Sequence, residues 1–349
     1  MDPDEYFMKR CLELAEKGLG SVAPNPMVGA VIVSDGKIIG EGFHEKFGEA
    51  HAEVNAINSV HDHELLKRCT LYVSLEPCSH TGKTPPCTDL IIEKRIPKLV
   101  IGCRDEHPLV NGRGIKRLLD AGIFAEVGTL EEECLEMNRR FFTSVLSEQP
   151  YVILKWAQTA DGFIDHTRIP GDGKPPLRIS SEESIELSHQ WRSEEQAIMV
   201  GTGTALMDDP LLTVRARKGR NPLRILIDRE LKVPAHAKIF SKDAQTLVFS
   251  EKSAENTMNV DHFKVKMDSF NEMYYPIARE LNERGIRSLI VEGGAKLIRS
   301  FINANAWHEA RVIISSSKIG TGLAAPVLGR KALSRSKVGV DDLFIFRNR

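Results

Sequence analysis

Several features that would assign the chain to a common class of protein are missing. No apolar run approaches the roughly 20 residues that a membrane-spanning helix needs, so no membrane insertion is expected. The first residues, MDPDEYFMKR, carry acids where a secretory signal has basic residues and an apolar block, and a cytoplasmic location is expected. The formal net charge of −1 lacks the basic excess of a protein that binds a phosphate backbone. A small-molecule substrate is therefore favoured over nucleic acid.

Cysteine is absent from the second half of the chain and scarce in the first. The six cysteines are Cys11, Cys69, Cys78, Cys87, Cys103 and Cys134. Because no secretion signal is expected, we interpret them as thiols and not as a disulfide framework. Whether these thiols bind a metal ion depends on the residues that stand near each cysteine.

The length of 349 residues exceeds what one hydrophobic core usually organises, and two domains are expected. The segment SEQP at 147–150 is typical of a connector, since its proline ends a helical pattern. It separates a predicted domain over 1–147 from a second over 151–349. Short apolar strands alternate with amphipathic helices in both, which predicts two α/β folds.

Within the first domain, two apolar runs joined by Asp35 and Gly36 predict a β-hairpin over 29–42. The acidic start and the spaced apolar residues over 131–146 predict one last helix before the connector. In the second domain, the segments 165–177 and 251–262 are expected to be exposed loops.

One histidine and two cysteines stand where a catalytic zinc site needs them. Such a site has three protein ligands in a tetrahedron whose fourth position stays open. GEAHAEVNAI supplies His51, and LEPCSHTGKTPPC supplies Cys78 and Cys87. His51 and Cys87 fall at the expected starts of helices, where the helix dipole favours the thiolate form of cysteine. We therefore predict a zinc site made of these three residues.

Glu53 is the predicted proton carrier of this site. Two thiolates and a neutral imidazole cancel the charge of Zn²⁺, so water at the open position needs a base, and Glu53 can take its proton and pass it to the substrate. The H-x-E part of the zinc-deaminase signature matches His51 to Glu53, but residues 79–86 separate the two cysteines in place of two residues. A structural zinc site with His80 as fourth ligand is the alternative, and it leaves Glu53 without a role.

Motifs spread over nearly the whole chain resemble one enzyme family. The first half contains APNPMVGAVIV, GEAHAEVNAI, LEPCSHTGKTPPC and NGRGIKRLLDAGI, and the second contains KWAQTADG, MVGTGTALMDDPLLTVR, LRILID and LIVEGGAKL. Together they resemble the bifunctional deaminase/reductases of riboflavin biosynthesis, in which the long cysteine spacing is the family's own variant. The resemblance implies an N-terminal cytidine-deaminase-like α/β/α domain with a mixed sheet and a C-terminal dihydrofolate-reductase-like α/β domain.

By this resemblance, the first domain uses one zinc ion to hydrolyse the exocyclic amine of 2,5-diamino-6-(5-phosphoribosylamino)pyrimidin-4(3H)-one. The second domain then uses NADPH to reduce 5-amino-6-(5-phosphoribosylamino)uracil to its ribityl form. The implied partners are these phosphorylated pyrimidines, together with further copies of the chain, because dimers and tetramers are common in the family.

The resemblance also implies contacts with the deaminase substrate. They fall on Asn25, His44, His80, Lys83 and Asp105. From the residue types alone, Asn25 between two prolines is a turn former and Lys83 beside a glycine is an ordinary loop residue. His107 stands where the family carries an amide side chain.

Two glycine-rich turns follow apolar strands in the second domain, GTGTAL at 201–206 and EGGAKL at 292–297. Turns of this kind can place backbone amides at cofactor phosphates, although neither is a complete G-x-G-x-x-G. The resemblance implies cofactor contacts at Ala157, Ser180, Thr204, Asp208, Gly294, Ala295, Lys296 and Leu297. It implies substrate contacts at Arg192, Leu212, Arg215 and Glu292.

Arg192 and Arg215 would suit a substrate phosphate, because guanidinium groups pair bidentately with phosphate oxygens. Lys218 and Arg220 could address the 2′-phosphate of the cofactor. Three hypotheses remain for the chain as a whole. It is a bifunctional deaminase/reductase, or a zinc deaminase with a non-catalytic reductase-like domain, or a nucleic-acid-binding or RNA-editing module, against which the net charge argues.

Overall fold

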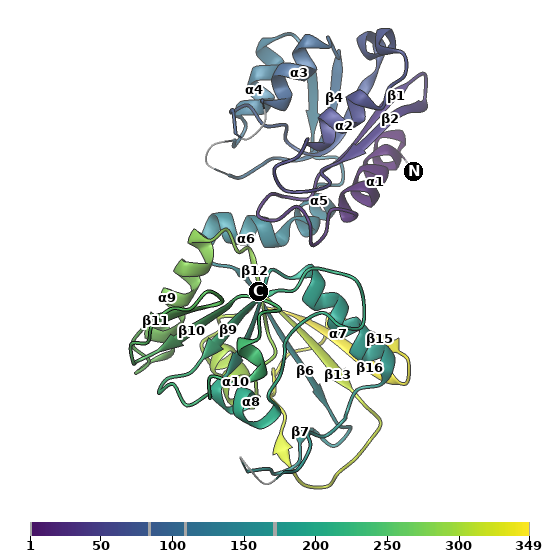
Figure 1. Cartoon of the computed structure of the whole chain (residues 1–349). Helices are drawn as coiled ribbons and strands as arrows, with labels where there is room; N and C mark the ends of the chain where they lie inside the picture. The colour runs from purple at the N-terminus through teal and green to yellow at the C-terminus, as the bar shows by residue number, and fades with distance from the viewer. Residues whose placement is uncertain (1, 83–84, 108–109, 170–172, 349) are drawn as a thin grey trace. The chain divides into compact units, whose positions relative to one another are not determined.

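The chain divides into two compact units, Met1–Glu148 and Gln149–Arg349, each with its own sheet and core. The computed structural model, shown in Figure 1, describes residues 2–82, 85–107, 110–169 and 173–348. Among the described helices, none is both long and apolar enough to cross a bilayer.

The described part of the first unit contains a mixed sheet of five strands in the order β2-β1-β3-β4-β5. The strands are β1 (Gly29–Ser34), β2 (Lys37–Phe43), β3 (Thr70–Leu75), β4 (Lys98–Cys103) and β5 (Phe124–Val127). β1 is antiparallel to β2 and β3, whereas β3, β4 and β5 run parallel. The predicted hairpin is confirmed, because Asp35 and Gly36 have φ values of 50° and 72°, the left-handed conformation of a type I′ turn.

Helices cover both faces of this sheet. They are α1 (Pro3–Glu16), α2 (Ala52–Asn58), η1 (His63–Arg68), α3 (Cys87–Glu93), α4 (Arg113–Asp120), α5 (Glu131–Met137) and α6 (Arg139–Ser147). On one face α3 and α4 bury Ile91 and Leu118 with α2. On the other, α1 and α5 bury Met8 and Cys134 with α6. The apolar residues therefore form two cores, and the unit has the predicted α/β/α layers (Figure 1).

The prediction of one helix over 131–146 is wrong, because the chain breaks into α5 and α6 at Asn138. This residue has φ −100° and ψ 18°, outside the helical region. Its side chain accepts from the backbone N–H of Met27 at 2.8 Å and donates to the Met27 carbonyl at 2.9 Å. The partner is 111 residues away, so no local pattern indicates the break.

The described part of the second unit contains a sheet of nine strands in the order β11-β10-β9-β8-β12-β6-β13-β16-β15. These strands are β6 (Tyr151–Gln158), β8 (Ala197–Gly201), β9 (Leu223–Ile227), β10 (Thr246–Ser250), β11 (Val260–Lys264), β12 (Ser288–Val291), β13 (Glu309–Ile314), β15 (Ser334–Val338) and β16 (Asp341–Arg347). From β11 to β13 every neighbouring pair is parallel, and β16 and β15 add antiparallel pairs. A separate small ribbon pairs β7 (Phe163–Asp165) with β14 (Leu323–Ala324).

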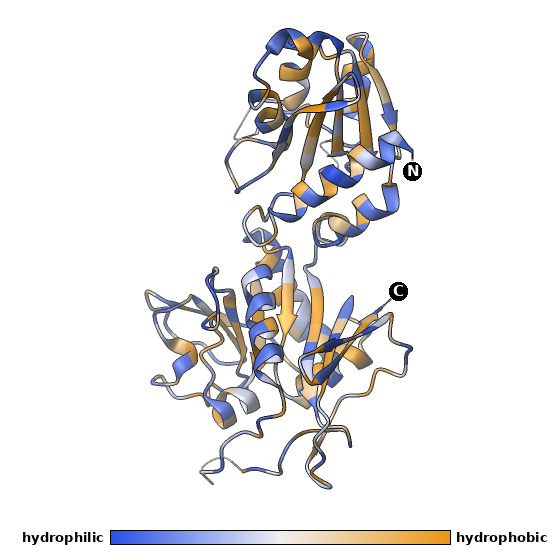
Figure 2. Ribbon diagram, turned by 90° about the vertical axis from the view of Figure 1, so that its right-hand side faces the viewer, coloured by the Kyte–Doolittle hydropathy of each residue, from blue (hydrophilic) through white to orange (hydrophobic). Residues whose placement is uncertain are grey.

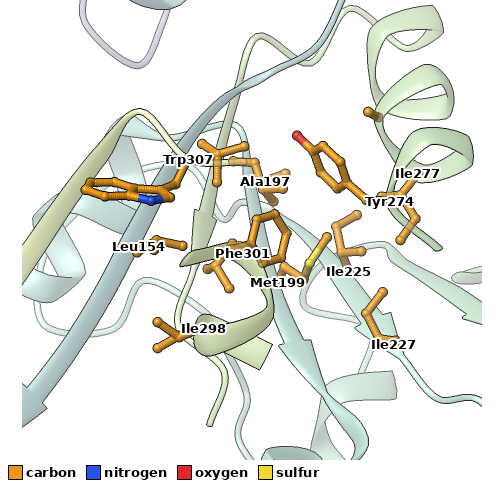
Figure 3. Close-up of a cluster of buried hydrophobic side chains, with 14 of the residues drawn as sticks. Leu154, Ala197, Met199, Ile225, Ile227, Tyr274, Ile277, Ile298, Phe301 and Trp307 are labelled. Atoms are coloured by element: carbon orange, nitrogen blue, oxygen red, sulfur yellow. The ribbon is translucent and has the colours of Figure 1, made fainter. Parts of the chain in front are cut away.

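Both faces of the large sheet are again covered, and its strands are mostly apolar (Figure 2). The covering helices are α7 (Glu182–Glu194), α8 (Thr202–Asp208), η2 (Lys238–Phe240), α9 (Phe270–Glu283) and α10 (Ala295–Asn303). Phe301 of α10 lies among Met199, Tyr274 and Trp307 in one core (Figure 3). Trp191 of α7 packs in the core on the opposite face. Because parallel strands bring their carboxyl ends to one edge, the loops after β6, β8, β9 and β12 meet there.

Candidate active sites

His51, Cys78 and Cys87 come together in the first unit. Their ligand atoms all lie within 4.8 Å of one another, and no second group of this kind occurs in the described ranges. His51 Nδ1 is 3.6 Å from Cys78 Sγ and 3.3 Å from Cys87 Sγ. One imidazole nitrogen and two sulfurs are the donors that zinc prefers, and three ligands leave one position open. The residues present therefore fit a catalytic zinc ion.

Three elements carry these ligands. His51 is the N-cap of α2, Cys78 follows β3, and Cys87 is the first residue of α3. The backbone N–H of Cys87 donates to Cys78 Sγ at 3.3 Å, so the start of α3 points at that sulfur. The hydrogen bond with the Cys87 side chain lowers the pKa of Cys78 against the effect of burial. Cys78 is therefore ready as a thiolate, the form that binds metal.

Glu53 lies in the first turn of α2, two residues after His51, and is only 4% exposed. Burial raises its pKa to about 7, and the charge of Cys78 adds to the rise. A carboxyl group with a pKa near neutrality can both accept and release a proton. Glu53 is not in the ligand group, but its side chain interacts with that of Cys87, so it has the position and the chemistry of a proton carrier beside the metal ligands.

His44 and Asn25 form one hydrogen-bonded pair next to this group. His44 Nδ1 lies 3.0 Å from the Ala50 carbonyl, which can only accept, so Nδ1 carries the proton. Its Nε2, 3.1 Å from Asn25 Nδ2, must then be the acceptor. Burial lowers the pKa of His44, which keeps the ring neutral. The His44 and His51 ring centroids are 5.3 Å apart, so the pair borders the metal ligands.

The other predicted deaminase contacts have different surroundings. Asp105 follows β4 and is 6% exposed, and burial raises its pKa to about 6. His107 donates its backbone N–H to Asp105 Oδ1 at 2.9 Å, and its ring stacks on Phe141. His80 is exposed and lies outside the ligand group, which removes the support for a structural zinc site. The predicted contact at Lys83 lies outside the described residues.

In the second unit, Glu292 binds two cations whose side chains are only 12% and 13% exposed. Arg192 pairs with it bidentately at 2.7 and 2.9 Å, and Lys155 Nζ is 3.7 Å from Glu292 Oε2. Burial alone would raise the pKa of Glu292, but the charges of Arg192 and Lys155 outweigh burial and lower it to about 2. Lys155 was not among the predicted residues. The signal for it is a lysine inside the otherwise largely apolar strand YVILKWAQ.

A cavity of about 830 Å³ opens at the carboxyl ends of the parallel strands. All eight residues predicted at the cofactor line it, as do Glu292 and Lys155. The two glycine turns approach closely there, since a Cβ on Gly293 would lie 2.7 Å from the Cα of Val200. Backbone amides of both turns thus border one cavity, which suits the phosphates of a nucleotide cofactor.

Three of the predicted substrate contacts do not line this cavity, namely Arg192, Leu212 and Arg215. The Arg192 guanidinium is engaged by Glu292 and not exposed for a phosphate. Leu212 is buried with φ of 54°, and Arg215 is exposed, with its backbone N–H bound to His189 Nδ1 at 3.2 Å. Asp208 does line the cavity, and Arg168 binds it together with Asp165. Segment 165–169 is thereby tied to α8 and is only partly a free loop.

Fold and site define a zinc-type nucleobase deaminase unit joined to a reductase unit with a nucleotide cavity. The model for the zinc-binding region of cytidine and deoxycytidylate deaminases matches residues 1–103, and the RibD C-terminal domain model matches 150–339. The chain belongs to the family of the riboflavin biosynthesis protein RibD, the bifunctional deaminase/reductases. The predicted family, α/β fold class and bifunctional enzyme are confirmed.

Relatives extend this similarity over the whole chain. Riboflavin biosynthesis protein RibD of Aquifex aeolicus is 41% identical, covering 95% of this chain and 92% of its own length. The RibD of Escherichia coli K12 is 33% identical, with coverages of 91% and 89%. A solved diaminohydroxyphosphoribosylaminopyrimidine deaminase/5-amino-6-(5-phosphoribosylamino)uracil reductase from Thermotoga maritima has a TM-score of 0.88 at 39% identity and covers 99% of both chains. These matches favour a catalytic second unit over a non-catalytic one.

Proposed function

We propose that this chain catalyses two consecutive steps of riboflavin biosynthesis. Residues 1–147 deaminate 2,5-diamino-6-(5-phosphoribosylamino)pyrimidin-4(3H)-one, and residues 151–349 reduce 5-amino-6-(5-phosphoribosylamino)uracil to the ribityl product with NADPH. The observation that carries the proposal is the pairing of two unlike sites in one chain. One is a His-Cys-Cys group beside a buried carboxyl, and the other is a nucleotide-sized cavity beside a buried carboxylate and two cations.

His51, Cys78 and Cys87 would hold one zinc ion per chain. When bound, zinc supplies the Lewis acidity that makes water reactive toward the carbon that bears the amine. The Glu53 carboxylate accepts the proton of that water at one of its oxygens. It delivers this proton to the ring nitrogen. It then takes the second proton from the hydroxyl group that has been added to the carbon and passes it to the departing ammonia, and a pKa near 7 permits both uptake and release.

Asn25, His44, His80, Lys83 and Asp105 are the proposed contacts of the deaminase substrate. Asn25 Nδ2 is used by His44, so the Asn25 side-chain carbonyl remains available to accept from the base. The Asp105 carboxyl can accept from an amino group of the same base. His44 also holds the Asn25 amide in one orientation through its fixed tautomer.

For reduction, the proposed substrate contacts are Arg192, Leu212, Arg215 and Glu292, and we add Lys155 because it lines the cavity beside Glu292. NADPH, when bound, supplies the hydride. The glycine turns would hold its phosphates through Thr204, Gly294, Ala295, Lys296 and Leu297, with Ala157, Ser180 and Asp208 along the same cavity. Lys155 and Glu292 would face the substrate as a buried donor and a buried acceptor, which orients the ribosyl group toward the nicotinamide.

Arg229 supports NADPH over NADH. Arg229 follows β9, which lies two strands away from β12 in the sheet. It lines the same cavity as Glu292, which follows β12. Glu251 holds its guanidinium at 2.7 Å, and 51% of the side chain is exposed. In dinucleotide-binding sheets an arginine near the ribose accommodates the 2′-phosphate. Lys218 and Arg220 do not line the cavity, so we assign this role to Arg229.

The decisive experiment supplies the diaminopyrimidine phosphate with and without NADPH and identifies the products by mass. We expect the deaminated ribosyl compound without cofactor and the ribityl compound with it. Ammonia release without NADPH oxidation would support the zinc deaminase with a non-catalytic second domain, and no ammonia release would refute the proposal. A homo-oligomer and a cytoplasmic location stay predictions, and sedimentation velocity tests the first.

A further inference from the structure

Glu76 is a buried carboxylate that the proposed chemistry leaves without a role. It follows β3 directly and precedes Pro77 and the metal ligand Cys78. It is 4% exposed, and no described ion pair includes it. A buried anion without a cation needs strong hydrogen-bond donors around both of its oxygens.

Four backbone N–H groups supply those donors. Oε2 accepts from Gly112 at 2.9 Å and from Asp105 at 3.3 Å. Oε1 accepts from Gly114 at 2.9 Å and from Ile115 at 3.3 Å. The first residues of α4 have no intrahelical acceptor, so the carboxylate satisfies them and meets the positive end of the helix dipole. A single side chain therefore joins Asp105, two residues after the end of β4, to the start of α4.

The fit between these segments is close. A Cβ on Gly114 would lie 2.1 Å from the Pro77 carbonyl oxygen and 3.1 Å from Glu76 Oε1. Only glycine lets α4 approach the Glu76–Cys78 segment to this distance. The segment Glu76–Cys78, which ends in a metal ligand, therefore also holds in place the segment that begins at the proposed substrate contact Asp105.

We propose that Glu76 is a positioning residue for deamination, whose carboxylate holds Asp105 at a set distance from Cys78 and therefore from the metal site. This rests on the proposed substrate contact of Asp105. Both oxygens are needed, because an amide side chain would turn an NH₂ group against two of the four N–H donors. Glu76→Gln keeps the volume of the side chain and replaces one of its two acceptor oxygens. It therefore loses the hydrogen bonds with one pair of N–H groups, those of Asp105 and Gly112 or those of Gly114 and Ile115.

The test measures zinc content and the kcat and KM of ammonia release in the full chain for Glu76→Gln, Asp105→Asn and the double variant. Glu93→Gln, an exposed carboxylate at the end of α3, is the matched control. We expect Glu76→Gln to keep its zinc, to raise KM about tenfold and to change kcat by less than about threefold. The KM of the double variant should be no higher than that of Asp105→Asn, since both substitutions remove the same contact between Asp105 and the substrate. Reduction of preformed uracil intermediate by the same protein should not change.

Loss of zinc, an unchanged KM, or additive effects in the double variant would each overturn the proposal. If Asp105→Asn leaves KM unchanged, the proposed contact between Asp105 and the substrate is refuted, and so is this inference, which depends on it. If Asp105→Asn raises KM and Glu76→Gln does not, only this inference falls. Should Glu76→Gln fail to fold, Gly114→Ala decides, because it displaces α4 while leaving the carboxylate in place. It should raise KM with zinc retained, and an unchanged KM would contradict the proposal.

Discussion

The backbone N–H of Gly294 donates to Thr204 Oγ1 at 2.7 Å and joins two glycine turns that are 90 residues apart in the chain. Each turn alone is a weak pattern, since neither has the full spacing of a dinucleotide-binding motif. Joined, they line the same cavity. Removing this hydrogen bond therefore tests whether the two turns act as one cofactor site.

Thr204→Val removes the acceptor and keeps the shape of the side chain. We expect the Kd for NADPH to rise roughly fivefold to tenfold, because one hydrogen bond contributes about 1 kcal/mol. Fluorescence titration with NADPH measures it. Thr204→Ser, which retains the hydroxyl, should bind almost as the parent does, and equal losses in both variants would show that the hydrogen bond is not what matters.

Glu53→Gln should abolish ammonia release while zinc remains bound. The amide cannot take up or deliver the proton, and general acid–base catalysis contributes about 10²- to 10⁴-fold. Ammonia release and metal content of the same preparation are the two measurements. An active variant would exclude Glu53 as the proton carrier.

Cys87→Ser should lose both the metal and deamination, because a serine hydroxyl does not replace a thiolate ligand of zinc. Reduction of preformed uracil intermediate should continue at nearly the parent rate, since the two sites lie in separate compact units. Metal analysis and NADPH oxidation check the two halves of this prediction. Simultaneous loss of both activities would show that the units depend on one another.

Glu292→Gln should abolish reduction and destabilise the second unit by about 3 kcal/mol, because it leaves the charges of Arg192 and Lys155 buried and unpaired. Urea unfolding followed by tryptophan fluorescence measures the loss. All three tryptophans, Trp156, Trp191 and Trp307, lie in this unit, so the signal reports on it alone. A variant as stable as the parent would mean that the cations are hydrated.

His308 should make the second unit less stable as pH falls from 6.5 toward 4. Burial lowers the pKa of its ring to about 4 in the folded chain, so the unfolded state binds the proton first on acidification. The stability it contributes is complete above pH 6.5, and about 2 kcal/mol of it should be lost between pH 7 and pH 5. Unfolding of His308→Gln at both pH values should show a smaller difference than the parent. Identical differences would rule out His308 as the source.

Much of the deaminase site could be predicted from the sequence because its signals are local. His51 and Glu53 stand two residues apart at a helix start, and a turn of Asp35 and Gly36 requires left-handed backbone that few residue pairs adopt. The strand-helix alternation that makes both units α/β is likewise a pattern of neighbouring residues. Spacing and turn chemistry need no knowledge of distant partners.

The tertiary structure decided the rest. Lys155 meets Glu292, Asn138 meets Met27, and Glu76 grips the start of α4 across long stretches of chain. In the sequence each of these is a single polar residue in an ordinary context, because its role comes from burial next to a partner. The sequence by itself determined which residues could bind zinc and move protons, and the fold determined which charges and amides surround them. A buried polar group is defined by what satisfies it, and only packing brings that partner within reach.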